Sequence, residues 1–132
     1  MILVAGPPCG GKTTYVQQHA LATDTILDFD DIVERLTGDR YTRTPATIAA
    51  ARAEWKRCLP DADWVIYSAP RSSQRASLRK QYGANAIVVT ASIDECLRRA
   101  RASRPASWQE LIRQWFTDWQ PSANDHLVDT GC

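Results

Sequence analysis

The sequence of 132 residues contains no apolar run that approaches the roughly 20 residues of a membrane-spanning helix, so no membrane association is expected. Its net charge is only +1, and no overall positive field therefore draws the chain to nucleic acid. It has two histidines and four cysteines, and no two of the cysteines have the spacing of metal ligands. These shortages argue against a membrane protein, a strongly basic nucleic-acid-binding protein and a cysteine-based metal site.

No internal repeat, linker or low-complexity segment divides the chain, so residues 1–132 are expected to form a single domain. A hydrophobic content of 44% with 23% charged residues is ordinary for a globular protein. Only three of the 16 basic residues are lysines. Arginine matches phosphate geometry better than lysine does, but genome composition produces the same bias, and both explanations stay open.

Residues 6–14 fit the phosphate-binding loop pattern of a glycine, four residues and Gly-Lys-Thr. Glycines permit backbone angles that turn successive N–H groups toward a phosphate chain. Lys12 adds a positive charge at the β- and γ-phosphates, and the Thr13 hydroxyl is a ligand for Mg²⁺. An apolar run precedes the loop and a segment that can form a helix follows it, which favours this interpretation over a glycine-rich turn that binds nothing. ATP is therefore expected to bind to Gly6, Pro7, Pro8, Cys9, Gly10, Gly11, Lys12, Thr13 and Thr14.

Cys9 lies inside this loop, and a nucleotide site implies a reducing cytosol. A cytoplasmic location is therefore expected.

Apolar runs and helix signals alternate along the chain. Strands are expected at residues 2–5, 25–29, 64–68 and 86–90, with a fifth short strand at 126–130. Helices are expected at 11–21, 30–36, 44–59, 70–83, 92–103 and 107–119, the last two with capping boxes, and the segment 38–44 is expected to be a mobile loop. The alternation predicts an α/β domain with a parallel sheet, helices on both faces and ligands beyond the carboxyl ends of the strands.

Three acids follow the second predicted strand, at Asp28, Asp30 and Asp31. Because side chains alternate along a strand, Asp28 and Asp30 are expected to face the same way. Asp28 can then orient Mg²⁺, and Asp30 can accept a proton from an attacking hydroxyl. The alternative is that these acids only cap the next helix.

Two groups of arginines can serve a phosphoryl-transfer site. Those at 98, 99, 101 and 104 precede Pro105, a position that resembles that of the mobile lid in P-loop kinases, and Arg99 and Arg104 are the main candidates to stabilise a moving phosphoryl group. A solvated helix face is the alternative for at least half of them. Arg71 and Arg43 are expected to bind the acceptor, whereas Arg75 and Arg79 are expected on the surface.

Six large apolar residues between Trp108 and Trp119 repeat at helical spacing. This face is expected to be core rather than a surface for stacking bases. Part of it can pack against another subunit, so a homo-oligomer is an open expectation.

The phosphate loop and the acids together resemble the small P-loop kinases. The loop followed by a strand and Asp30-Asp31 is similar to the kinase domain of phage polynucleotide 5′-hydroxyl kinase, in which the first acid is the general base. Residues 27–38, with their D-x-D and Thr-Gly, resemble the shikimate kinases, in which the second aspartate meets the acceptor hydroxyl. Both resemblances place the base at Asp30. They imply a three-layer P-loop kinase fold with five parallel strands in the order 2-3-1-4-5.

The chain departs from both families. Val33 stands where polynucleotide kinases carry an arginine, the third strand ends in Tyr67-Ser68 rather than in an acid, and the triple glycine of shikimate kinases is absent. Magnesium then depends on Thr13 and Asp28 among the protein ligands, and neither family's acceptor can be carried over.

The sequence favours a kinase that transfers the γ-phosphoryl group of ATP-Mg²⁺ to a hydroxyl or phosphate acceptor, with a polynucleotide 5′-end or a nucleotide first. A small hydroxylated metabolite is the next acceptor. The other classes are an ATPase or nucleotide-binding switch without an acceptor and a nucleotide-binding protein without turnover.

Overall fold

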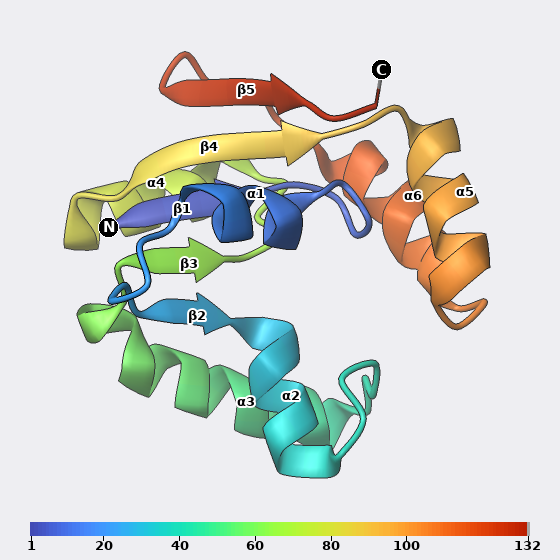
Figure 1. Ribbon diagram of the computed structural model, residues 1–132, viewed down its shortest axis with the longest axis horizontal. Helices are drawn as coiled ribbons and strands as arrows, with labels where there is room; N and C mark the ends of the chain where they lie inside the picture. Colours follow the sequence, from blue (N-terminus) through green and yellow to red (C-terminus); the bar gives the residue numbers. More distant parts are fainter. Residues whose placement is uncertain (132) are drawn as a thin grey trace.

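The computed structural model describes residues 1–131, in which five parallel strands form one sheet (Figure 1). The strands are β1 (Ile2–Ala5), β2 (Ile26–Asp28), β3 (Trp64–Ile66), β4 (Asn85–Thr90) and β5 (Asp125–Asp129). They pair in the order β2-β3-β1-β4-β5, and every pair is parallel. The expected sheet, its order and its α/β class are confirmed.

Helices cover both faces of this sheet, as the sequence predicts. They are α1 (Lys12–His19), α2 (Phe29–Thr37), α3 (Pro45–Cys58), α4 (Ser72–Tyr82), α5 (Ile93–Ser103) and α6 (Trp108–Asp118). Helix α1 packs on one face through Val16, which joins Val4 and Val89 of the strands. Helices α2, α3, α4 and α6 pack on the other face, around Leu3 and Val65. No helix among residues 1–131 has the length and apolar character that crossing a membrane requires.

Local signals set most helix ends. Thr44 caps α3 by accepting a hydrogen bond from Thr47 N at 3.2 Å, and Ser92 caps α5 by accepting one from Glu95 N at 3.1 Å. The predicted capping box at Ser107 is wrong, because the Ser107 side chain makes no capping hydrogen bond to α6. There the backbone forms a turn instead, in which Trp108 N donates to Pro105 O at 3.0 Å.

The acidic segment at residues 28–31 does not have the strand geometry expected from the sequence. Strand β2 ends at Asp28, and α2 already begins at Phe29. Asp28 is the N-cap of α2, and its carboxylate accepts a hydrogen bond from Asp30 N at 3.0 Å. Asp28 and Asp30 are therefore related by a helix cap and not by the alternation of a strand.

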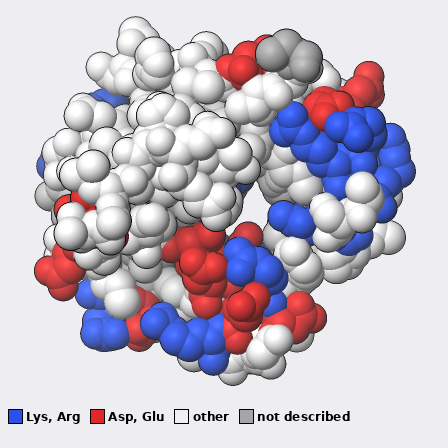
Figure 2. Space-filling model, in the orientation of Figure 1, with Lys and Arg blue, Asp and Glu red and all other residues white. Residues whose placement is uncertain are grey.

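The loop between α2 and α3 is tethered by ion pairs, so the prediction that residues 38–44 are untethered is wrong. Arg40 donates to Asp31 at 3.0 Å and to Glu34 at 3.3 Å. Arg43 forms an ion pair with Asp30 and donates to the carbonyl oxygen of Arg40 at 2.9 Å. Figure 2 shows acidic and basic side chains gathered in this part of the molecule, beside a hollow in the surface.

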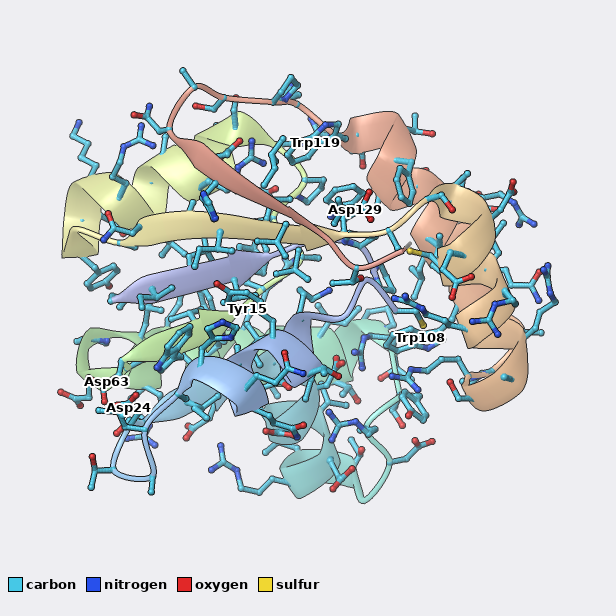
Figure 3. The ribbon with its side chains drawn as sticks, turned by 45° about the horizontal axis from the view of Figure 1, so that its top comes forward. Tyr15, Asp24, Asp63, Trp108, Trp119 and Asp129 are labelled. Atoms are coloured by element: carbon cyan, nitrogen blue, oxygen red, sulfur yellow. The ribbon has the colours of Figure 1, made fainter. Side chains whose placement is uncertain are left out.

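Helix α6 divides its apolar face between the core and a cleft. Trp108, Ile112 and Trp115 are buried, as predicted, but 42% of Leu111 is exposed. Trp108 begins α6 and Trp119 follows its last residue, so these two rings mark opposite ends of the helix (Figure 3). The remaining correction concerns Arg75, which is predicted on the surface but is only 1% exposed.

Candidate active site

The phosphate-binding loop runs from the end of β1 to the start of α1. Gly6 has φ +150°, and a Cβ there would lie 2.0 Å from Val89 O, so the loop packs directly on the backbone of β4. Gly11 has φ +103°, in the left-handed region that favours glycine. The loop therefore has the strand–turn–helix context that distinguishes a phosphate-binding loop from an ordinary glycine-rich turn.

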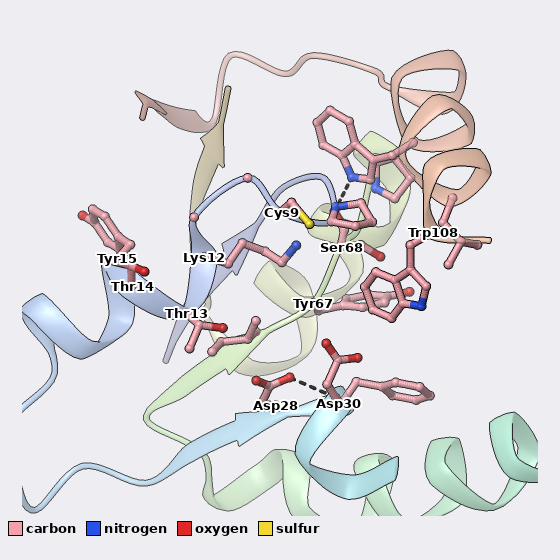
Figure 4. Close-up of a pocket in the computed structure, with 18 of the residues that line it drawn as sticks. Cys9, Lys12, Thr13, Thr14, Tyr15, Asp28, Asp30, Tyr67, Ser68 and Trp108 are labelled. Atoms are coloured by element: carbon pink, nitrogen blue, oxygen red, sulfur yellow. Dashed lines mark hydrogen bonds between the residues drawn. The ribbon is translucent and has the colours of Figure 1, made fainter. Parts of the chain in front are cut away.

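Lys12 places its ammonium group inside this loop. Its Nζ donates to Gly6 O and Pro7 O, both at 2.8 Å, and the side chain points into the cleft (Figure 4). Burial lowers the pKa of Lys12 to about 8, while the nearby carboxylates of Asp30 and Asp28 oppose this shift. An anion bound in the loop would stabilise the charged ammonium and raise its pKa again.

This shift predicts that ATP binding takes up protons at alkaline pH. At about pH 8.5, Lys12 of the free protein is largely neutral, so binding of the triphosphate should take up about half a proton or more. The uptake should shrink towards about pH 7, where Lys12 is already charged. Titration calorimetry in buffers of different ionisation enthalpy measures this number. A Lys12→Met variant that still binds ATP with the same proton uptake would show that another group is responsible.

Two carboxylates lie across the cleft from Lys12, at the start of α2 (Figure 4). Asp28 is 6% exposed, and its pKa is raised to about 6, first by burial and then by the charges of Asp30 and Asp31. Thr13 lines the same cleft. The Thr13 hydroxyl and the Asp28 carboxylate are hard oxygen donors of the kind that Mg²⁺ takes. No group of three His, Cys, Asp or Glu side chains suited to a metal occurs among residues 1–131.

The side of the cleft beyond Asp30 combines arginines with aromatic rings. The Arg43 guanidinium pairs with Asp30 and lies 5.3 Å from the centre of the Trp108 ring. Arg104 lies 5.7 Å from the same ring and 5.0 Å from that of Tyr41. Two guanidinium groups thus approach one indole, and Trp108 is buried by cations as well as by apolar side chains.

Arg104 retains free hydrogen-bonding capacity. Its Nη1 donates to Ser103 O at 3.3 Å and to Ser103 Oγ at 3.1 Å. Its Nε is buried and has no hydrogen-bond partner within residues 1–131. Arg104 thus lines the cleft with one donor that residues 1–131 leave unpaired.

The two other predicted arginines, Arg99 and Arg71, differ in their positions. Arg99 donates to Cys9 O at 3.0 Å and to Thr130 O at 2.9 Å, so its guanidinium meets carbonyl groups of the loop. Arg71 is 3.5 Å from Asp118, and 56% of its side chain is exposed. Arg71 is absent from the lining of the cleft, whereas Arg43, Arg99 and Arg104 contribute to it.

The whole cleft has a volume of about 1460 Å³ and extends beyond the acids, between α3 and α6. The face of α3 that lines it consists of Ile48, Arg52, Trp55 and Lys56. From the sequence, none of these four residues is assigned to a site. The only signal was the three- to four-residue spacing, which is the same for a core face and a cleft face.

Comparison with known proteins places the domain in a family. The profile of the AAA domain family matches residues 1–111. Gluconokinase from Sinorhizobium meliloti 1021 superposes with a TM-score of 0.67 at 18% identity, over 99% of this chain and 82% of that one. Shikimate kinase from Acinetobacter baumannii in complex with shikimate gives 0.64 at 16% identity, over 99% and 83%.

A chain of the Pnkp1/Rnl/Hen1 RNA repair complex superposes with a TM-score of 0.69 at 13% identity, over 89% of this chain but only 42% of that one. No curated protein sequence matches. At these identities the structural likeness shows the fold, which is that of the small P-loop kinases.

Proposed function

The chain belongs to the AAA domain family, and we propose that it is an ATP-dependent kinase. The observation that carries this proposal is the arrangement of the cleft, with Lys12 in the phosphate-binding loop and Asp30 opposite it (Figure 4). A triphosphate on the loop would direct its γ-phosphoryl group toward Asp30. Solved structures of the same fold include a gluconokinase and a shikimate kinase, which agrees with transfer to an acceptor.

In the proposed reaction an acceptor oxygen attacks the γ-phosphorus as the bond to the β–γ bridging oxygen breaks and ADP leaves. Asp30 accepts the proton of the acceptor hydroxyl. Lys12 and the backbone N–H groups of the loop would hold the phosphates, and Arg104, which lines the cleft, would stabilise the charge that develops on the moving group. Thr13 and Asp28 would hold Mg²⁺, which neutralises phosphate charge when it is bound.

For the acceptor we propose a polynucleotide 5′-end or a nucleotide. The chamber between α3 and α6 is lined by aromatic rings, including Trp55 and Tyr67, and by the cations Arg52 and Lys56. Such a combination suits a molecule with flat bases and phosphate groups. A small hydroxylated metabolite is the second candidate, because a gluconokinase and a shikimate kinase superpose on this chain.

The test is transfer of label from γ-labelled ATP in the presence of Mg²⁺ to a panel of acceptors. The panel contains a 5′-hydroxyl oligonucleotide, nucleoside monophosphates, gluconate and shikimate. Label on one of the first two supports the proposal in full, and label on a metabolite supports a kinase with the second class of acceptor. Labelled phosphate released at the same rate with and without every acceptor would identify an ATPase and overturn the proposal.

A further inference from the structure

Thr130, directly after β5, contacts the phosphate-binding loop from outside. Its Oγ1 lies 2.6 Å from Gly10 O and 3.1 Å from Thr90 O, so the hydroxyl donates to a carbonyl of the loop or to one of β4. Its backbone N donates to Thr90 O at 2.8 Å, which fixes the residue to the end of the sheet. Thr130 therefore joins the loop to two strands.

Arg99 reaches the same place from α5. Its Nη1 donates to Cys9 O at 3.0 Å, its Nη2 donates to Thr130 O at 2.9 Å, and its Nε donates to Glu95 at 3.0 Å. The guanidinium thus connects the tip of the loop, the end of β5 and its own helix. Arg99 thus holds the carbonyl of Cys9 by a hydrogen bond, as Thr130 holds that of Gly10.

The direction of these bonds matters for anion binding. A loop presents its N–H groups to a phosphate only when its carbonyl groups point the other way. Cys9 has φ +62°, an uncommon value for a residue with a side chain, so this part of the loop needs support. The carbonyls of Cys9 and Gly10 are the two that Arg99 and Thr130 hold.

The space around Gly11 agrees with a tight fit. A Cβ at Gly11 would lie 3.1 Å from Thr130 Oγ1, which shows how closely Thr130 approaches the start of α1. Thr130 also contributes to the lining of the cleft.

We propose that Thr130 and Arg99 are positioning residues that hold the phosphate-binding loop in its anion-binding shape, an inference that rests on the proposed function. Arg99 then acts through the loop backbone and not by contact with the γ-phosphate. The two residues serve any ligand that places phosphates on the loop. ADP, which has no γ-phosphate, distinguishes this role from that of a lid arginine.

The experiment measures the affinities for ADP, ATP and tripolyphosphate of the full chain by titration calorimetry. Thr130→Val removes the hydroxyl and keeps the branched shape, and Thr130→Ser keeps the hydroxyl. Thr130→Val is expected to lower the affinity for all three ligands by a similar factor of about 2 to 10. The affinities of Thr130→Ser are expected to stay near those of the wild type. Arg99→Met should likewise lower the affinities for ADP and ATP by similar factors. Thr117→Val is the matched control, because within residues 1–131 the exposed Thr117 hydroxyl bonds only to Arg113 O in its own helix.

The outcomes separate the two proposals. Unchanged ADP affinity in both Thr130→Val and Arg99→Met would overturn the positioning role, as would a loss for ATP alone. Failure of the wild type to bind any of the three ligands would instead contradict the proposed function. Thermal unfolding of each variant identifies a loss caused by misfolding. If Thr130→Val or Arg99→Met is misfolded, Thr130→Ser provides the test. This variant keeps the hydroxyl, so weakened ADP binding by folded Thr130→Ser would contradict the proposal.

Discussion

Asp30→Asn is expected to slow transfer of the γ-phosphoryl group by about 10²- to 10⁴-fold while ATP still binds. The amide keeps the shape of the side chain but cannot accept the proton of the acceptor hydroxyl. The contacts of the phosphate-binding loop described above do not involve this carboxylate, because they come from Lys12, Arg99 and Thr130 and from the ends of β1 and β4. Single-turnover transfer from labelled ATP, together with the ATP dissociation constant, measures both effects.

The neighbouring acid provides the control for this prediction. Asp31 also lies in the first turn of α2, but 63% of its side chain is exposed and it pairs with Arg40. Asp31→Asn should therefore change the transfer rate little. Equal losses in the two variants would point to a general effect of negative charge at the start of α2. An unchanged rate in Asp30→Asn would remove Asp30 from the role of base.

Arg43 adds a further reason why Asp30 is suited to this role. The ion pair ties the carboxylate to the α2–α3 loop, and Arg43 itself is tied to the carbonyl groups of Arg40 and Thr42 at 2.9 and 2.8 Å. The base is thus held at the edge of the cleft by a residue that the sequence suggested as an acceptor ligand. With these bonds made, Arg43 is better placed to orient Asp30 than to grip an acceptor alone.

The sequence predicts those parts of the molecule whose signals are contiguous. The phosphate-binding loop has all its groups within residues 6–14, and the apolar run 86–90 is almost the whole of β4. The order of the strands followed from resemblance to the P-loop kinases, and pairing along the sheet confirms it. In these segments the local sequence is sufficient to predict the structure, because contacts with distant residues agree with the local preference.

The acidic segment shows a limit of that reasoning. The run 25–29 looks like one strand, but the Asp28 carboxylate accepts the Asp30 N–H and starts a helix one residue earlier. Aspartate readily makes such local bonds in place of a strand ladder. The chemistry assigned to Asp28 and Asp30 does not depend on the alternation, because the cap also places both residues at the cleft.

Arginines were the residues least predictable from spacing. The positions 71, 75 and 79 repeat every four residues, which is equally compatible with a solvated helix face. Arg75 is buried only because its partner, Asp125, comes to it from the start of β5, 50 residues along the chain. Nothing near Arg75 in the sequence indicates this contact.

Arg75 has no unpaired nitrogen. Its Nε and Nη2 donate to the two carboxylate oxygens of Asp125, both at 2.9 Å, and its Nη1 donates to Ala69 O at 2.8 Å. The guanidinium also lies 4.6 Å from the centre of the Trp119 ring. These contacts connect α4, the turn after β3, the end of α6 and β5.

Arg75→Met is therefore expected to destabilise the fold by about 3–5 kcal/mol, because it leaves the carboxylate of Asp125 buried without its cation. Arg79→Met, one helical turn further along α4 on an exposed side chain, should change the free energy of unfolding by less than about 0.5 kcal/mol. Urea unfolding of both variants measures the difference. The double variant Arg75→Met/Asp125→Leu should recover much of the loss, since a buried pair replaced by apolar side chains is often nearly neutral. A double variant no more stable than Arg75→Met would locate the cost in the other lost bonds, from Arg75 to Ala69 O and Gln120 O and from Ser122 N to Asp125, and not in the unpaired carboxylate.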